Sequence, residues 1–282
     1  MKQATFETIA GLLKARSGLM VSADKDYLLR SRLEPVARAH GLSGLDALAD
    51  RLHALPGGTL ADRVIEAMTT NESLFFRDRR PFEHLAGAIT RMAAARPPGR
   101  ALRIWSAAAS SGQEAYSIAM VVADLAHILG ERRVDILGSD IAAGQIARAR
   151  EGLYTGFEVQ RGLPPAMLDR HFRREGLNWR ISGAMRARVT FCVFNLLDDP
   201  RPLGCFDIIF CRNVLIYFDA PTKARVLGAL RQVIAPDGLL YLGGAETVIG
   251  LGDGFVPVAD EPGAYAAVPN PAATFPALIT AG

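Results

Sequence analysis

The sequence contains few of the residues that build a metal centre, a disulfide framework or a membrane span. Its three cysteines are odd in number and show no CxxC spacing, so we expect free thiols in a reducing cytoplasm. The five histidines are scattered and give no visible metal ligand set. No apolar run reaches the ~18–20 residues of a membrane helix, and the start lacks the apolar core of a signal peptide. We therefore expect a cytoplasmic protein with no metal and no membrane insertion.

An excess of charge of either sign is also missing. The 282 residues carry 32 Lys and Arg against 29 Asp and Glu, and the net charge is +3. The whole excess lies in residues 1–98, which have 14 basic and 11 acidic side chains. This is too mild for nucleic-acid binding, but it is compatible with docking onto an acidic protein surface. Because half of the residues are hydrophobic, the chain can bury the core of one large or two smaller domains.

The pattern of apolar residues changes near Pro97-Pro98-Gly99. Before this point apolar residues recur at helical spacing. After it, short apolar strands alternate with helices, which predicts a parallel α/β sheet covered on both faces. We expect a helical N-terminal domain at 1–80, a linker helix at 81–99, an α/β domain at 100–268 and a flexible tail at 269–282. Within the α/β domain, the β-type pieces of 178–196 predict a small hairpin-like insert.

Loops that follow the predicted strands are the places to look for a ligand, because open α/β sheets bind at the carboxyl ends of their strands. The loop 106–113 is made of small residues and leads to Glu114 at a helix start. Its single glycine is too few for a dinucleotide fingerprint, so a plain tight turn is an equal interpretation. Asp140, after the next strand, either caps a helix or accepts hydrogen bonds from ribose hydroxyls. Taken with the first loop, the ligand interpretation is favoured.

Two further segments carry polar residues that a plain core or linker does not need. The apolar strand 206–211 ends in Arg212 and Asn213, and Tyr217 follows closely. Asp207 begins this strand, so it belongs to the opposite rim and we expect no catalytic role for it. The segment TTNESLFFRD (69–78) mixes two aromatics with Asn, a hydroxyl and Arg. On its own, this segment is best interpreted as a helix cap whose two phenylalanines pack the domains together.

Six motifs together resemble the CheR family of chemotaxis receptor methyltransferases. In this order and spacing they are TTNESLFFRD, RIWSAAASSGQEAYSIAM, ILGSDI, RGLP, FNLLD and FDIIFCRNVLIYFD, and the resemblance spans about residues 5–268. It implies a Rossmann-like, S-adenosylmethionine-dependent methyltransferase sheet with a small antiparallel β-subdomain near 178–196, preceded by a small all-helical domain. It also implies methyl transfer to glutamate side chains of chemoreceptors, giving glutamate methyl esters and S-adenosylhomocysteine.

Carried over by position, the resemblance implies a set of site residues. Those lining the cofactor site would be Asn71, Ser73, Arg77, Glu114, Asp140, Asn195, Leu196, Arg212 and Asn213. The catalytic residues next to the transferred methyl would be Arg77 and Tyr217. None of three departures from the family pattern removes a proposed contact. Ser73 stands where Thr is usual and keeps the hydroxyl, Gln113 and Ala115 stand where Glu and Pro are usual beside the retained Glu114, and 242–246 is LGGAE rather than the commoner LGHSE.

The implied chemistry needs no general base, because a glutamate with an ordinary pKa of about 4.3 is already ionised at neutral pH. The lack of histidine in the site motifs agrees with this. Two alternatives stay open: the same reaction on another signalling protein, and a catalytically silent S-adenosylmethionine-binding regulatory module. Retained Arg77 and Tyr217 argue against the silent module. The absence of an Asn/Asp-Pro-Pro-Tyr/Phe motif argues against nucleic-acid methylation. We expect a monomer whose partner is the cytoplasmic domain of chemoreceptors.

Overall fold

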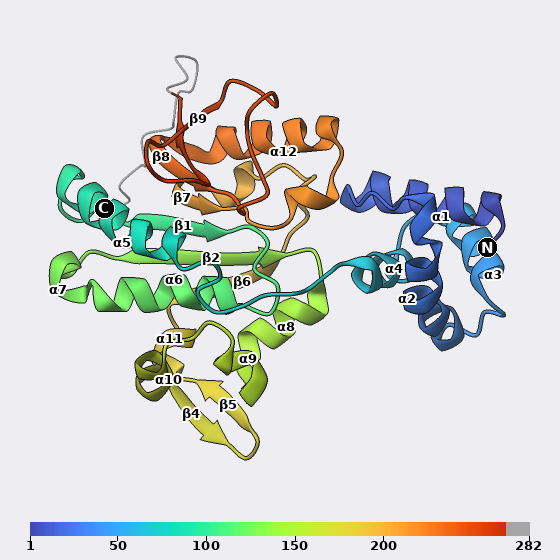
Figure 1. Cartoon of the computed structure of the whole chain (residues 1–282), viewed down its shortest axis with the longest axis horizontal. Coiled ribbons are helices and arrows are strands. Elements are labelled where there is room, and N and C mark those ends of the chain that lie inside the picture. Colours follow the sequence, from blue (N-terminus) through green and yellow to red (C-terminus); the bar gives the residue numbers. More distant parts are fainter. Residues whose placement is uncertain (269–282) are drawn as a thin grey trace, which may run out of the picture.

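A computed structural model describes residues 1–268, and the expected tail at 269–282 lies outside the described residues. The chain begins with a group of helices at one end of the molecule (Figure 1). They are α1 (Gln3–Ser17), the 3-10 helix η1 (Ala23–Lys25), α2 (Asp26–Ala39), α3 (Leu45–Ala54) and α4 (Thr59–Met68). Their apolar stripes meet in one core that includes Ile9, Leu33, Leu48 and Val64. Among the described residues, no helix is both long and apolar enough to cross a membrane.

Seven strands form the central sheet, in the order β6-β2-β1-β7-β8-β10-β9. The parallel strands are β1 (Leu102–Ser106), β2 (Val134–Asp140), β6 (Val189–Val193), β7 (Phe206–Phe210) and β8 (Ile234–Tyr241). The antiparallel strands β9 (Phe255–Pro257) and β10 (Ala264–Ala267) complete one edge. Every residue of β7 is buried, as its apolar sequence predicts for a strand covered on both faces.

Helices cover the two faces of this sheet and create a core on each. One core contains α5 (Arg80–Ala95), α6 (Gln113–Asp124) and α7 (Ala126–Leu129), and Phe82, Ile104 and Ile118 belong to it. The other contains α12 (Ala220–Val233), which packs Val226 and Leu230 against the sheet. Because side chains alternate along a strand, neighbouring residues of β1 enter different cores. The expected linker helix thus packs on the sheet as α5, while the predicted domain boundaries stay a prediction.

A second, three-stranded antiparallel sheet corrects the expected hairpin. It pairs β3 (Leu153–Thr155) and β4 (Phe172–Glu175) with the central β5 (Asn178–Ile181), and α9 (Gly156–Gln160), α10 (Pro165–His171) and α11 (Gly183–Arg186) surround it. The hairpin prediction for 178–196 is wrong, because its second piece is β6, which pairs in parallel with β2 at the edge of the main sheet. Alternating burial along β6, with Val189 and Phe191 inward, is typical of a half-exposed strand and does not reveal its partner.

Asp207 lies at the rim opposite the carboxyl ends of the strands, as the sequence predicts. Its carboxylate accepts a 2.6 Å charged hydrogen bond from the guanidinium of Arg96, which is itself buried. The backbone N–H of Arg103 donates to the other oxygen at 2.9 Å. Asp237 binds the same arginine at 2.7 Å. This buried group of charges ties the end of α5 to β1 and β7, because a buried carboxylate is stable only when it is paired and hydrogen-bonded.

Candidate active site

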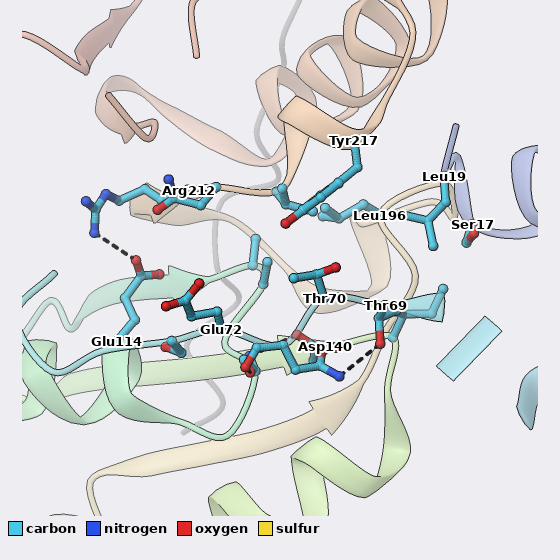
Figure 2. A pocket seen from close by; sticks show the side chains of 18 of the residues that line it. Ser17, Leu19, Thr69, Thr70, Glu72, Glu114, Asp140, Leu196, Arg212 and Tyr217 are labelled. Carbon is cyan, nitrogen blue, oxygen red and sulfur yellow. Dashed lines mark hydrogen bonds and ion pairs between the residues drawn. The ribbon is translucent and has the colours of Figure 1, made fainter. Parts of the chain in front are cut away.

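A cavity opens at the carboxyl ends of the parallel strands, where the helical group meets the sheet. Figure 1 shows the segment between α4 and α5 running back across these strand ends. The structure brings every residue of the predicted site to the lining of this one cavity: Asn71, Ser73, Arg77, Glu114, Asp140, Asn195, Leu196, Arg212, Asn213 and Tyr217. In Figure 2, Tyr217 faces Asp140 and Thr70 across the cavity. The sequence motifs are therefore neighbours in space, although up to about 150 residues separate them in the chain.

Arg212 forms the centre of an ion triad with Glu114 and Asp78 at one side of the cavity, and Figure 2 shows its pair with Glu114. Its Nη1 donates to Glu114 Oε2 at 3.2 Å and its Nη2 to Asp78 Oδ2 at 2.6 Å. The side chain of Arg212 is 1% exposed, and its Nε has no partner among the described residues. Burial raises the pKa of Glu114, and Arg212 and the hydroxyl of Ser106, 2.8 Å away, oppose that rise. The arginine thereby favours the carboxylate form of Glu114.

Asp140 ends β2 and combines the two roles that its sequence position suggests. Its Oδ1 accepts from the backbone N–H of Ala142 at 2.9 Å, at the start of α8 (Ala143–Glu151). Its Oδ2 accepts from the N–H of Ser110 at 2.9 Å, and this bond ties it to the loop after β1. Burial raises the pKa of Asp140, and the backbone N–H groups oppose that shift. Each oxygen keeps a lone pair for a further donor, so the helix-cap and ligand interpretations are compatible.

The segment from Asn71 to Arg79 has an unusual backbone. Phe76, Asp78 and Arg79 adopt φ values of 48°, 68° and 46°, a left-handed conformation that non-glycine residues rarely adopt. Such residues cost of order 1 kcal/mol each and cluster at functional sites. This backbone turns Asp78 towards Arg212 and leaves Arg77 at the cavity, where its Nη1 donates to the carbonyl of Glu72 at 3.2 Å.

The two phenylalanines of this segment pack as the sequence predicts for apolar residues, but on different neighbours. Phe75 is fully buried and makes edge-to-face contacts with Tyr154 of β3 and Phe172 of β4. Phe76 packs on Phe82 of α5. The aromatics therefore fasten the 69–78 segment to the small sheet and to α5. The same segment thus contributes aromatic side chains to the core and polar side chains to the cavity lining.

The end of α1 contributes to the site, although no sequence motif there indicates it. The side chains of Ser17 and Leu19 line the cavity. The backbone N–H of Met20 donates to the carbonyl of Tyr217 at 2.9 Å, and Asn195 Nδ2 donates to the carbonyl of Arg16 at 2.6 Å. These contacts join residues about 180–200 positions apart, and no local motif encodes such a pairing.

Glu246, in the turn after β8, is a second residue that sequence reasoning missed. Its carboxylate is buried and accepts hydrogen bonds from the backbone of the loop that begins at Asn213. The only signal was a single acid in a turn of small residues, LGGAE. The 3-10 helix η3 (Leu215–Tyr217) follows in that loop and positions Tyr217, while η2 (Arg201–Leu203) lies away from the cavity lining.

The donor and acceptor groups of the cavity fit a nucleoside cofactor with a cationic amino-acid arm. Asp140 offers carboxylate acceptors for hydroxyls. Glu114, in the first turn of α6, is a second carboxylate acceptor in the lining of the same cavity. Ala107 and Ala108 let a ligand approach the backbone closely. The parallel sheet with this loop and acid pair defines an α/β protein of the nucleotide-cofactor-binding class.

The chain belongs to the CheR methyltransferase family, and S-adenosylmethionine is its cofactor. The family model described as "CheR methyltransferase, SAM binding domain" matches residues 71–261, and "CheR methyltransferase, all-alpha domain" matches residues 4–69. The protein is therefore an S-adenosylmethionine-dependent methyltransferase, as the motifs predict.

Curated relatives cover nearly the whole chain. Chemotaxis protein methyltransferase Cher2 of Pseudomonas putida is 39% identical over 262 residues, which is 92% of this chain and 95% of the relative. Chemotaxis protein methyltransferase 1 of Pseudomonas aeruginosa is 39% identical over 264 residues, 92% of this chain and 96% of the relative. Among solved structures, a TehB-like SAM-dependent methyltransferase from Corynebacterium glutamicum aligns with 68% of this chain and 94% of its own, with 15% identity and a TM-score of 0.36.

Proposed function

We propose that this methyltransferase transfers the methyl group of S-adenosylmethionine to glutamate side chains in the cytoplasmic domain of chemoreceptors, forming methyl esters. The observation that carries the proposal is the convergence of Arg77 and Tyr217 with the acid pair Glu114 and Asp140 on one cavity. The relatives named chemotaxis protein methyltransferases support the choice of partner. In this proposal the enzyme acts as a cytoplasmic monomer.

The residues that hold the cofactor are those of the predicted set. S-adenosylmethionine supplies a methyl group on a positively charged sulfur. Asp140 would accept hydrogen bonds from the ribose hydroxyls with the lone pairs that Ser110 and Ala142 leave free. Glu114, whose carboxylate form Arg212 favours, would accept from the cationic amino-acid arm. Asn71, Ser73, Asn195, Leu196 and Asn213 complete the wall of the site.

Arg77 and Tyr217 act on the acceptor rather than on a proton. The acceptor glutamate is ionised at neutral pH, and the cavity lining within residues 1–268 contains no histidine. Arg77 donates paired N–H bonds to the incoming carboxylate, because its guanidinium is engaged only by the Glu72 carbonyl in the described structure. The Tyr217 hydroxyl orients the attacking oxygen. Catalysis then depends on holding oxygen, methyl carbon and sulfur in line, with reacting atoms about 3–3.5 Å apart.

Labelled methyl transfer tests this function directly. The protein is incubated with methyl-labelled S-adenosylmethionine and membranes that carry chemoreceptors from the same organism, and labelled bands are treated with mild alkali. Receptor-bound label released as methanol is the expected result, because carboxyl methyl esters hydrolyse in alkali. Alkali-stable label contradicts glutamate as the acceptor. Label on a band other than a receptor contradicts the partner, and receptors with their acceptor glutamates changed to alanine provide the control.

A further inference from the structure

The carboxylate of Glu246 is built into a socket of backbone N–H groups beneath the site. Its Oε2 accepts from Asn213 N at 2.8 Å and Gly243 N at 2.6 Å. Its Oε1 accepts from Val214 N at 2.9 Å and Ile216 N at 3.2 Å. The residue is 9% exposed, so water does not replace these partners readily. One side chain thus binds four backbone N–H groups. Three of them belong to the loop that carries Asn213 and Tyr217, and the fourth belongs to Gly243.

The socket leaves no room for a side chain at Gly243. A Cβ atom at Gly243 would lie 2.6 Å from Asn213 Nδ2 and 2.8 Å from Glu246 Oε2. Asn213 itself has a φ of 58°, a left-handed conformation that asparagine tolerates better than most residues. The next residues enter η3, whose last member is Tyr217. The N–H groups of Asn213, Val214 and Ile216 donate to Glu246 rather than to a backbone carbonyl, so the shape of the loop depends on this carboxylate.

We propose that Glu246 is a positioning residue for methyl transfer. Its carboxylate fixes the Asn213–Ile216 backbone, and through it the place of Tyr217 opposite Asp140. A glutamine at this position accepts with one oxygen only and turns an amide N–H₂ towards two N–H donors, so half of the socket is lost. This inference rests on the proposed roles of Asn213 and Tyr217, and it adds a residue that touches neither the cofactor nor the acceptor.

The first test compares Glu246→Gln with Asp207→Asn, a matched loss of a buried carboxylate at the opposite rim. Asp207 also accepts several N–H bonds, but it has no contact with the cavity. We expect Glu246→Gln to lower kcat for receptor methylation about tenfold, equal to about 1.4 kcal/mol in the barrier. S-adenosylmethionine affinity by calorimetry should fall only several-fold. Asp207→Asn should lower the thermal midpoint while kcat per folded enzyme stays unchanged. A folded Glu246→Gln protein with wild-type kcat overturns the proposal.

A glycine pair keeps the test decisive if the glutamine variant does not fold. Gly243→Ala adds a Cβ that crowds the socket, while residue 246 remains glutamate. A Cβ at the adjacent Gly244 meets nothing within 4 Å. Neither glycine has a positive φ, so alanine brings no backbone strain at either position. We expect Gly243→Ala to lower kcat and Gly244→Ala to leave it unchanged. Equal kcat values for the two variants contradict the positioning role.

A double-mutant cycle with Tyr217→Phe separates positioning from a general loss of structure. If Glu246 acts through Tyr217, then Glu246→Gln reduces kcat much less in the Tyr217→Phe background than in the wild type. Fully multiplicative losses overturn the proposal. A failure of the proposed function has a different result, because the wild-type enzyme then labels no receptor. In that case the role of Glu246 is tested by the change in S-adenosylmethionine affinity that Glu246→Gln transmits through Asn213.

Discussion

Gly18, the residue that ends α1, offers a test of whether the helical group is part of the methyl-transfer site. Gly18 has a φ of 77°, and a Cβ there would lie 3.0 Å from Phe218 Cε1 and 3.0 Å from Thr222 Cγ2. Phe218 directly follows Tyr217, so a side chain at position 18 pushes on the loop that carries Tyr217. Gly41 provides the matched control, because its φ is 68° and a Cβ there meets nothing within 4 Å.

The expected loss of stability in Gly18→Ala has two separate causes. Alanine in a left-handed conformation costs about 1–2 kcal/mol at either glycine. Only Gly18→Ala adds crowding against Phe218 and Thr222, and overpacking of this kind typically costs about 1–3 kcal/mol. Relief of that crowding moves the α1 end away from the loop and weakens the Met20–Tyr217 hydrogen bond, which contributes about 1 kcal/mol. If that bond orients Tyr217, its loss lowers the rate of methyl transfer about fivefold.

The assay pairs unfolding with kinetics. Urea unfolding should show Gly18→Ala less stable than Gly41→Ala by about 1–3 kcal/mol. Single-turnover methylation at saturating S-adenosylmethionine should be about fivefold slower for Gly18→Ala and near wild type for Gly41→Ala. Equal rates for the two variants would show that the α1 end is only a structural neighbour of the site, and equal stabilities would refute the crowding argument.

Three other perturbations give distinct outcomes. Tyr217→Phe should slow methyl transfer tenfold or more while calorimetry finds S-adenosylmethionine binding near normal; lost binding would contradict its assignment to the acceptor. Asp140→Ala should weaken S-adenosylmethionine binding at least tenfold, because it removes the hydroxyl acceptor and leaves the Ser110 and Ala142 amides unpaired; unchanged affinity would contradict the ribose role. Burial lowers the pKa of His84, which lies 2.8 Å from the Tyr241 hydroxyl, below its ordinary value of 6.5. Between that lowered pKa and 6.5 the unfolded chain binds more protons, so stability is full above pH 6.5 and falls as the pH drops through this window. His84→Gln should flatten the fall, measured by urea unfolding between pH 7.5 and 5, and an unchanged slope would contradict this cause.

The sequence predicts the sheet and the position of the site because both depend on local patterns. The run 206–211 is apolar except for Asp207 near its start, and a parallel sheet puts the polar residues that follow such strands on one edge. The expected strand 206–211 matches β7 (Phe206–Phe210) closely. The motifs also name residues that all line the same cavity. Their individual roles stay a prediction.

What the sequence does not predict depends on contacts between distant segments. The edge strand β6 was placed in a hairpin, because alternating burial identifies a strand but not its partner. Asp78 joins Arg212 across 134 positions, and Glu246 binds a loop about 30 residues before it. Such pairs form only when folding brings the strand ends together, so they carry no periodic signal in the chain. Long-range partners of this kind were the part of the site that was missed.

In the proposed mechanism, the charges of the cavity explain how the acceptor carboxylate is both attracted and kept reactive. Arg212 is held by Asp78 and Glu114, so its positive charge is largely neutralised before any acceptor arrives. Within residues 1–268, Arg77 forms no ion pair with an acidic side chain. A single half-exposed arginine is therefore left to meet the incoming glutamate. A stronger grip would stabilise the ground-state carboxylate as much as the transition state and would not raise kcat. In the proposed mechanism the ion triad thus limits how tightly the acceptor is bound, while Tyr217 sets the direction of attack.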